Sequence, residues 1–244
     1  RRGLPVLERD SWELGSFLGT YLQNAAIGIA TGAPTLEVHE ELCNAARIGQ
    51  LHFKLASRRS IGEAFTIAGK THQLPANNAT SFTALSYWII SVRVSMITRD
   101  EKGLQDLLLS AIALYGDGFS KLEKNDRLEG LLYMSIARGD KEQAAMSINE
   151  LLQSPSSSEY FKLLKGPELA LWLSLLTNKF TSDQLADALS NHQIFWGTQE
   201  NRSNANGWIS LPLLHACAYA HDHGMEIEVE SDYIPRWLVT GDFD

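Results

Sequence analysis

Residues 101–115 read EKGLQDLLLSAIALY, and this stretch decides the class of fold. Its apolar residues recur at the i, i+3, i+4 and i+7 spacing that places side chains on one face of an α-helix. They are Leu104, Leu107, Leu108, Ala111, Ile112 and Tyr115. The stretch therefore predicts an amphipathic helix that packs one face against a hydrophobic core.

The same spacing recurs in later stretches of the chain, which favours a fold built almost entirely of helices. We expect helices at residues 10–30, 36–57, 60–70, 79–98, 101–115, 118–138, 140–153, 167–178, 182–196 and 208–223. Consecutive helices joined by short loops pack as antiparallel hairpins, and no fixed repeat period is visible. We therefore predict an all-α fold in which residues 1–244 form one domain, a single multi-helix bundle of antiparallel helical hairpins.

Capping residues agree with this pattern of helices. Three pairs have the spacing of reciprocal N-terminal caps: Ser60 with Glu63, Asp140 with Gln143, and Thr181 with Gln184. Three residues mark helix ends: Gly139, Pro155 and Gly224. The polar runs at residues 154–158 and 197–207 offer no apolar surface to bury, so we expect loops there.

Residues 225–230, MEIEVE, depart from the helical pattern because apolar and acidic residues alternate. The apolar set is Met225, Ile227 and Val229, and the acidic set is Glu226, Glu228 and Glu230. An isolated strand has no ladder partner. The alternation therefore predicts either one short strand or an extended segment that lies across the helices.

Composition limits the classes of partner. Apolar residues make up 44% of the chain, which is enough for a packed core, and the formal net charge is −8. A phosphate backbone repels such a surface, so we expect no nucleic-acid partner, whereas a basic protein is electrostatically favoured. The longest apolar stretch, residues 17–33, is interrupted by polar residues and is too short to span a bilayer, so we expect no membrane partner.

The two cysteines, Cys43 and Cys217, lie far apart in apolar helical patterns. A thiol in that setting usually behaves as a small buried hydrophobe. We therefore expect free thiols in a reducing compartment, which predicts a cytoplasmic protein. A disulfide between the two is the alternative.

The best candidate metal ligands are His215, His221, Asp222 and His223, near the end of one predicted helix. Histidines two residues apart on a helix point in different directions, and no zinc-binding spacing supports a site. We expect His221 and His223 to interact with the helix C-terminus instead. The sequence therefore predicts no metal and no cofactor.

Motifs of common enzymes are absent from the sequence. There is no GxSxG elbow, no Gly-rich phosphate loop and no kinase-like HRD or DFG. We therefore predict that the protein is not an enzyme, with an active site of convergent origin as the alternative.

The six tryptophans predict a well-filled core and anchored loops. Trp88 and Trp172 lie in apolar helical stripes, so we expect them to be buried. Trp196 and Trp208 flank the polar loop at 197–207 and are placed to hold its ends. Trp237, near the terminus, is expected to hold the tail against the helices.

Three stretches of the chain resemble the bacterial immunity protein 49 family. Residues 206–238, NGWISLPLLHACAYAHDHGMEIEVESDYIPRWL, are similar to the closing part of its sequence pattern, and residues 185–196 resemble a family helix that ends in an aromatic pair. Residues 87–108, YWIISVRVSMITRDEKGLQDLL, resemble its tryptophan-containing helix followed by an Arg-Asp turn. Two features depart from the pattern: Phe195 stands where tyrosine is expected, and residues 221–223 lie outside it.

The resemblance implies a mostly helical immunity protein, encoded beside a polymorphic toxin in interbacterial competition. Such a protein binds its cognate toxin and neutralises it by stoichiometric inhibition, without catalysis. The matched residues Trp208, Pro212, Gly224 and Pro235 are expected to shape the fold. Two alternatives stay open: a helical adaptor or effector chaperone that does not inhibit, and an enzyme that reverses toxin damage.

The densest acidic cluster supplies the candidate partner-binding residues. These are Glu226, Glu228, Glu230 and Asp232. Exposed charges commonly serve only solubility, so a solvated face is one interpretation. The other is that the cluster complements a basic toxin cleft and speeds encounter.

Overall fold

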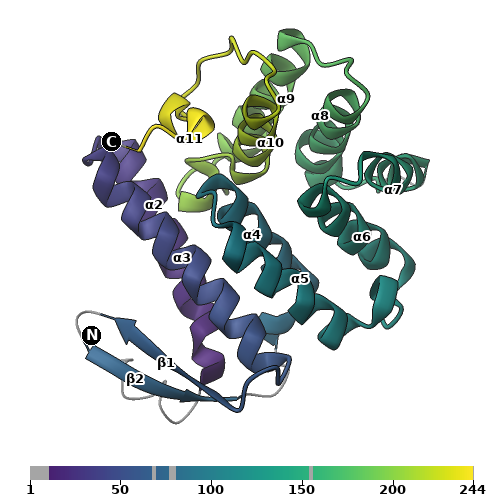
Figure 1. Ribbon diagram of the computed structural model, residues 1–244. Helices are drawn as coiled ribbons and strands as arrows, with labels where there is room; N and C mark the ends of the chain where they lie inside the picture. Colours follow the sequence, from purple (N-terminus) through teal and green to yellow (C-terminus); the bar gives the residue numbers. More distant parts are fainter. Residues whose placement is uncertain (1–10, 68–69, 77–80, 154–155, 244) are drawn as a thin grey trace.

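The computed structural model describes residues 11–67, 70–76, 81–153 and 156–243. It is mainly helical, with one small β-hairpin, which confirms the predicted class of fold (Figure 1). The longer helices are α2 (Leu14–Thr31), α3 (Thr35–Ala56), α4 (Leu85–Ile97), α5 (Glu101–Tyr115), α6 (Lys124–Arg138), α7 (Lys141–Gln153), α8 (Gly166–Leu176), α9 (Ser182–Trp196) and α10 (Leu211–Asp222). The short α11 (Arg236–Thr240) follows an extended segment near the C-terminus.

Helix α4 lies at the centre of the molecule. It contacts α3, α5, α6 and α10, and nine of its thirteen residues are buried. Apolar residues occupy all sides of a helix in this position, because each side faces another helix. The polar residues Ser91, Arg93 and Ser95 are buried as well, whereas Ser86 in the first turn is exposed.

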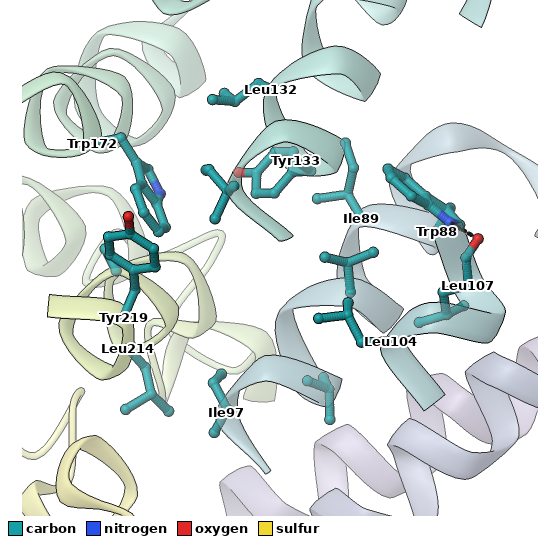
Figure 2. Packing of buried hydrophobic residues seen from close by; sticks show 14 of the residues in the cluster. Trp88, Ile89, Ile97, Leu104, Leu107, Leu132, Tyr133, Trp172, Leu214 and Tyr219 are labelled. Atoms are coloured by element: carbon teal, nitrogen blue, oxygen red, sulfur yellow. Dashed lines mark hydrogen bonds between the residues drawn. The ribbon is translucent and has the colours of Figure 1, made fainter. Parts of the chain in front are cut away.

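The hydrophobic core runs from α2 and α3 through α4 to α10 and holds the largest aromatic side chains (Figure 2). Trp88 and Trp172 are both fully buried, as the sequence predicted. The Trp88 indole nitrogen donates a 3.0 Å hydrogen bond to the Leu107 carbonyl oxygen, and the Trp172 ring packs 5.1 Å from that of Tyr219. Burial of the indole donor at Trp88 is therefore compensated.

The predicted caps and helix ends are confirmed at several boundaries. Thr181 and Gln184 form a reciprocal capping box at the start of α9. Asp140 accepts a 3.0 Å hydrogen bond from the backbone N–H of Gln143 at the start of α7. Gly139 ends α6 with a φ of 73°, in the left-handed region. Pro155 lies outside the described residues.

The prediction of a helix at residues 60–70 is wrong. Strands β1 (Gly62–Ile67) and β2 (Lys70–Pro75) form an antiparallel hairpin there, with Phe65 opposite His72. Side chains alternate between the core and solvent: Leu74 is buried, and Phe65 packs against the core. β-branched and aromatic residues favour strands. In this stretch the strand pattern therefore prevails over the helical spacing.

The expected cap at Ser60 and Glu63 is absent for the same reason. The Ser60 hydroxyl accepts a 3.2 Å hydrogen bond from the Gly62 N–H, which starts the strand rather than a helix. The Glu63 carboxylate forms a 2.7 Å ion pair with Lys54 of α3. Glu63 therefore links the hairpin to the end of α3.

Several helices begin later than predicted. Helix α4 follows the 3-10 turn η2 (Ser81–Thr83), and α6 follows the 3-10 turn η3 (Asp117–Phe119). Gly116 and Gly118 have φ values of 82° and 56°, so a continuous helix cannot pass through them. A π-helical turn, η4 (Phe161–Lys165), leads into α8 and was not predicted. Among the described helices, none is both long and apolar enough to cross a membrane.

Candidate functional site

An open groove lies beside the extended segment that joins α10 to α11. Its volume is about 1560 Å³, and every residue from 225 to 237 lines it. Other lining residues come from the end of α2, from Val38 of α3, and from α11. Figure 1 shows α11 between the end of α2 and α10. We call it the C-terminal groove.

The chain enters this segment through a tight reversal at the end of α10. Gly224 has a φ of 76°, and the Met225 N–H donates a 2.9 Å hydrogen bond to the Ala220 carbonyl oxygen. The imidazole Nδ1–H of His223 donates a 2.8 Å hydrogen bond to the Tyr219 carbonyl oxygen. These bonds satisfy carbonyls that the helix end leaves open, and they direct the following residues away from α10.

The segment alternates in burial as it does in sequence. Met225, Ile227 and Val229 are half-buried against the hydrophobic core, whereas the glutamates between them are exposed. The structure describes an extended segment here rather than a strand, the second of the two predicted possibilities. The acidic side chains of this segment therefore share its exposed face.

All four sequence-predicted site residues line the C-terminal groove. They are Glu226, Glu228, Glu230 and Asp232, and each is exposed. The Arg236 guanidinium lies 3.4 Å from the Glu230 carboxylate, but both side chains are more than three-quarters exposed, so the pair contributes little energy. The segment thus has four carboxylates against one guanidinium, and its surface is negative.

The end of the segment is attached to the preceding loop. The Ser210 N–H donates a 2.8 Å hydrogen bond to the Tyr233 carbonyl oxygen, and the Tyr233 ring lies 4.9 Å from the buried imidazole of His192. His192 Nε2 in turn donates a 3.0 Å hydrogen bond to the Gly207 carbonyl oxygen. These contacts hold the exit of the loop against α9.

The two tryptophans that flank the polar loop lie at its ends, as expected. Trp196 packs so closely over Gly207 that a Cβ atom there would lie 2.5 Å from the indole. Trp208 is half-buried and lines the C-terminal groove. Trp237 also lines the groove, with its ring 6.3 Å from that of Phe243. Aromatic surface therefore adjoins the acidic residues.

Arg99 connects the groove to the centre of the fold. It lies in the turn between α4 and α5, within the Arg-Asp turn of the sequence pattern. Its guanidinium donates hydrogen bonds of 2.8 Å to the Leu238 carbonyl oxygen and 2.6 Å to the Val239 carbonyl oxygen. It also lies 3.1 Å from the Asp222 carboxylate at the end of α10. One side chain thus joins α4, α10 and α11.

The structure does not bring the candidate metal ligands together. His215 is fully buried, 3.0 Å from the Met96 sulfur, and Asp222 faces Arg99. His223 bonds to the end of its own helix, as expected from the sequence. His221 is exposed, 3.5 Å from Asp222. Within the described ranges, no three His, Cys, Asp or Glu side chains are grouped closely enough to hold a metal ion.

A smaller hollow of about 550 Å³ lies over α3 and the start of α5, and Cys43 borders it. The Cys43 sulfur lies 3.4 Å from His39 Nε2, an arrangement that could resemble a catalytic pair. Burial, however, raises the pKa of the Cys43 thiol and lowers that of the His39 imidazole. Both shifts favour the neutral pair, and a neutral thiol is a weak nucleophile. Cys217 is buried, and both cysteines are free thiols.

A buried charge cluster between α4, α6 and α8 was not predicted. Arg93 lies 2.5 Å from the Glu168 carboxylate, and the Tyr133 hydroxyl donates a hydrogen bond to the same carboxylate. Lys165 lies 3.6 Å from Glu168 and 3.3 Å from Glu129. The signal in the sequence is a lone arginine within the apolar stretch YWIISVRVSMI, but its partners lie far along the chain.

The charges in this buried cluster stabilise each other. Burial by itself would raise the pKa of Glu168, but the adjacent Arg93 and Lys165 lower it to about 2. Burial likewise would lower the pKa of Arg93 and Lys165, and the Glu168 carboxylate raises both. The three groups therefore stay charged, and their arrangement is that of a structural cross-link between helices.

The described residues thus form a mainly helical protein with one open acidic groove and a paired interior charge cluster. The family model of immunity protein 49 matches residues 38–238, and the chain belongs to this family. The match begins well before the stretches that carry the resemblance in sequence. No curated protein and no solved structure matches the chain significantly.

Proposed function

We propose that this protein binds a cognate bacterial toxin and neutralises it by stoichiometric protein–protein inhibition, in the cytoplasm of the cell that makes the toxin. Membership of an immunity protein family supports a toxin partner. Binding alone suffices for this function, because a bound partner covers the toxin's active site or its substrate-binding surface. No catalytic group of the immunity protein takes part.

The proposed toxin-binding surface is the C-terminal groove. One observation carries this assignment: four exposed carboxylates follow one edge of an open groove whose other lining includes Ile29, Val38 and Trp237. Protein interfaces combine an apolar, aromatic centre with a polar rim. The groove offers both, and its rim carries a net negative charge.

The charge of the rim favours a basic toxin surface. Exposed carboxylates contribute little to stability, whereas complementary potentials raise association rates and exclude partners of like charge. The overall charge of −8 acts in the same direction at longer range.

The test of function is co-expression with the toxin domain encoded next to this protein. Growth and co-purification are followed together, with and without the immunity protein. We expect rescue of growth and a one-to-one complex in which the toxin is inactive. Failure of the two folded proteins to associate at micromolar concentration contradicts the proposal.

The same experiment separates the alternatives. An adaptor or chaperone would form the complex but leave the toxin active in it. An enzyme that reverses toxin damage would rescue growth at substoichiometric levels and without a stable complex. Titration of toxin activity against the immunity protein distinguishes a one-to-one end point from catalytic protection.

Charge reversal locates the binding surface. The triple substitution Glu226→Lys, Glu228→Lys and Glu230→Lys is expected to weaken toxin binding at least about ten-fold at low ionic strength. A matched control reverses the exposed residues Glu123, at the N-cap of α6, and Glu142 and Glu150, on α7; it changes the net charge equally. Equal binding by the two triple variants would move the interface away from the groove.

A further inference from the structure

The backbone of the acidic segment has an unusual property: its polar groups are unpaired. Residues 226–230 are extended, and none of their N–H or C=O groups bonds to another residue that the structure describes. Met225, immediately before this stretch, makes a backbone hydrogen bond to α10, and Tyr233, three residues after it, makes one to Ser210. The unpaired stretch is therefore fixed at both ends.

The side-chain contacts fix its orientation as well. Ile227 and Val229 pack inward on the core, and the glutamates point outward. In an extended chain the N–H and C=O groups point sideways, perpendicular to both sets of side chains. Residues of both sets line the groove. An extended backbone with unpaired polar groups offers a row of donors and acceptors along its edges, as an edge strand does.

We propose that an extended segment of the toxin adds to residues 226–230 as a β-strand. This inference rests on the proposed function and specifies how the groove recognises its partner. Main-chain hydrogen bonds supply affinity in this mode of recognition, and the alternating side chains supply specificity. Residues 226–230 would span about 17 Å of paired strand.

The negative charge of residues 226–230 determines which partner strand can pair with them. Directly opposed side chains on one face of a paired strand interact, so lysine or arginine is required opposite Glu226, Glu228 and Glu230. The residues between them face the apolar lining of the groove. The partner segment therefore alternates basic and aliphatic residues.

The same rule disfavours a second copy of this chain as the occupant. Antiparallel pairing of two such segments about Glu228 would place Glu226 opposite Glu230 and Glu228 opposite itself. Like charges in direct opposition destabilise a strand pair. The acidic face thus protects an open edge against self-association while it accepts a basic strand.

Amide hydrogen exchange at single-residue resolution tests the inference on the full-length protein. The probe is the adjacent toxin domain, added at saturating concentration. A strand that pairs along one edge protects alternate amides, either those of residues 226, 228 and 230 or those of 227 and 229. We expect exchange at one such set to slow at least about ten-fold, while the other set changes little.

The outcomes separate this inference from the function on which it rests. A stable, inhibited complex with no alternate-residue protection at 226–230 overturns strand addition and leaves neutralisation standing. A toxin that does not bind overturns both. Protection of the alternate amides in the protein alone, rising with its concentration, overturns the inference in favour of pairing between copies of this chain.

Discussion

Arg99 donates a 2.6 Å hydrogen bond to the carbonyl oxygen of Val239, so the turn between α4 and α5 is joined to the last turn of α11. The guanidinium satisfies carbonyls that α11, only five residues long, leaves open at its C-terminus. Gly241 lets the backbone approach closely, since a Cβ there would lie 3.1 Å from the guanidinium. Arg99 thus positions one wall of the groove without itself lining it.

Removal of Arg99 is expected to loosen α11. Arg99→Ala should lower the free energy of unfolding by about 2 kcal/mol, because hydrogen bonds to charged groups contribute about 1.5–3 kcal/mol each and this side chain is partly exposed. Arg99→Lys keeps the charge but loses the planar fork, so we expect it to recover only part of the loss. Urea unfolding measures both variants.

Hydrogen exchange provides the local control. In Arg99→Ala the amides of α11 should exchange faster while those of α7 do not change. Arg127→Ala, on the exposed face of α6, is the matched variant and should leave both unchanged. Uniform loss of stability without faster exchange in α11 would contradict a positioning role for Arg99.

Removal of the Glu168 charge is expected to destabilise the fold strongly. Glu168→Gln leaves Arg93 and Lys165 buried without their carboxylate, and breaking a buried pair costs about 3–5 kcal/mol. Glu129→Gln, at a partly exposed partner of Lys165, should cost far less. Chemical denaturation compares the two variants.

A double variant distinguishes charge imbalance from lost packing. Arg93→Met combined with Glu168→Gln removes one buried cation together with the anion, and it should regain part of the stability that Glu168→Gln loses. Additive losses in the double variant would show that the two charges do not depend on each other.

Periodicity predicted most helices but failed at the β-hairpin. Residues 60–70 contain the spacing of a helix cap, Ser60 with Glu63, and this local signal favoured a helix. The competing signal is the alternation of core-facing and solvent-facing side chains. It favours a hairpin only when both strands are considered, because Phe65 and Leu74 reach the core from different strands. The pairing of β1 with β2 depends on two stretches of sequence, so neither stretch predicts it alone.

Only the local part of the candidate site was predictable from the sequence. Alternation alone placed the glutamates of residues 226–230 on one face, and burial agrees. The groove beside them requires α2 and α11, which lie more than two hundred residues apart in sequence. The buried cluster likewise joins Glu168 to Tyr133 and Arg93, which lie 35 and 75 positions away in sequence. Contacts at such distances follow from packing rather than from local pattern.

Stability is expected to fall between about pH 7 and about pH 5 because buried histidines resist protonation. Burial lowers the pKa of His52 from 6.5 to about 4 and that of His215 from 6.5 to about 3. Below pH 6.5 the unfolded state takes up protons that the folded state does not, so stability present above that pH is lost as the pH falls. Each histidine contributes up to about 1.4 kcal/mol per pH unit.

Substitution isolates the histidine contribution. His52→Gln removes one titrating group and keeps a donor for the Phe82 carbonyl oxygen, so the slope of unfolding free energy against pH should decrease. The pKa of Glu168 is about 2, and its loss of charge adds to the effect only at lower pH. A flat profile for the unsubstituted protein between pH 7 and pH 5 would contradict this assignment.

The acidic groove should make toxin binding depend on salt through the association rate. Exposed charges are screened over about 10 Å at 0.1 M ionic strength, so raising salt from about 50 mM to about 500 mM should slow association more than it speeds dissociation. The triple variant Glu226→Gln, Glu228→Gln and Glu230→Gln should associate slowly at low salt and lose most of that salt dependence. Stopped-flow measurement with the toxin domain gives both rates. The matched triple glutamine variant at Glu123, Glu142 and Glu150 changes the net charge equally, so equal salt dependence in the two variants would assign the effect to overall charge rather than to the groove.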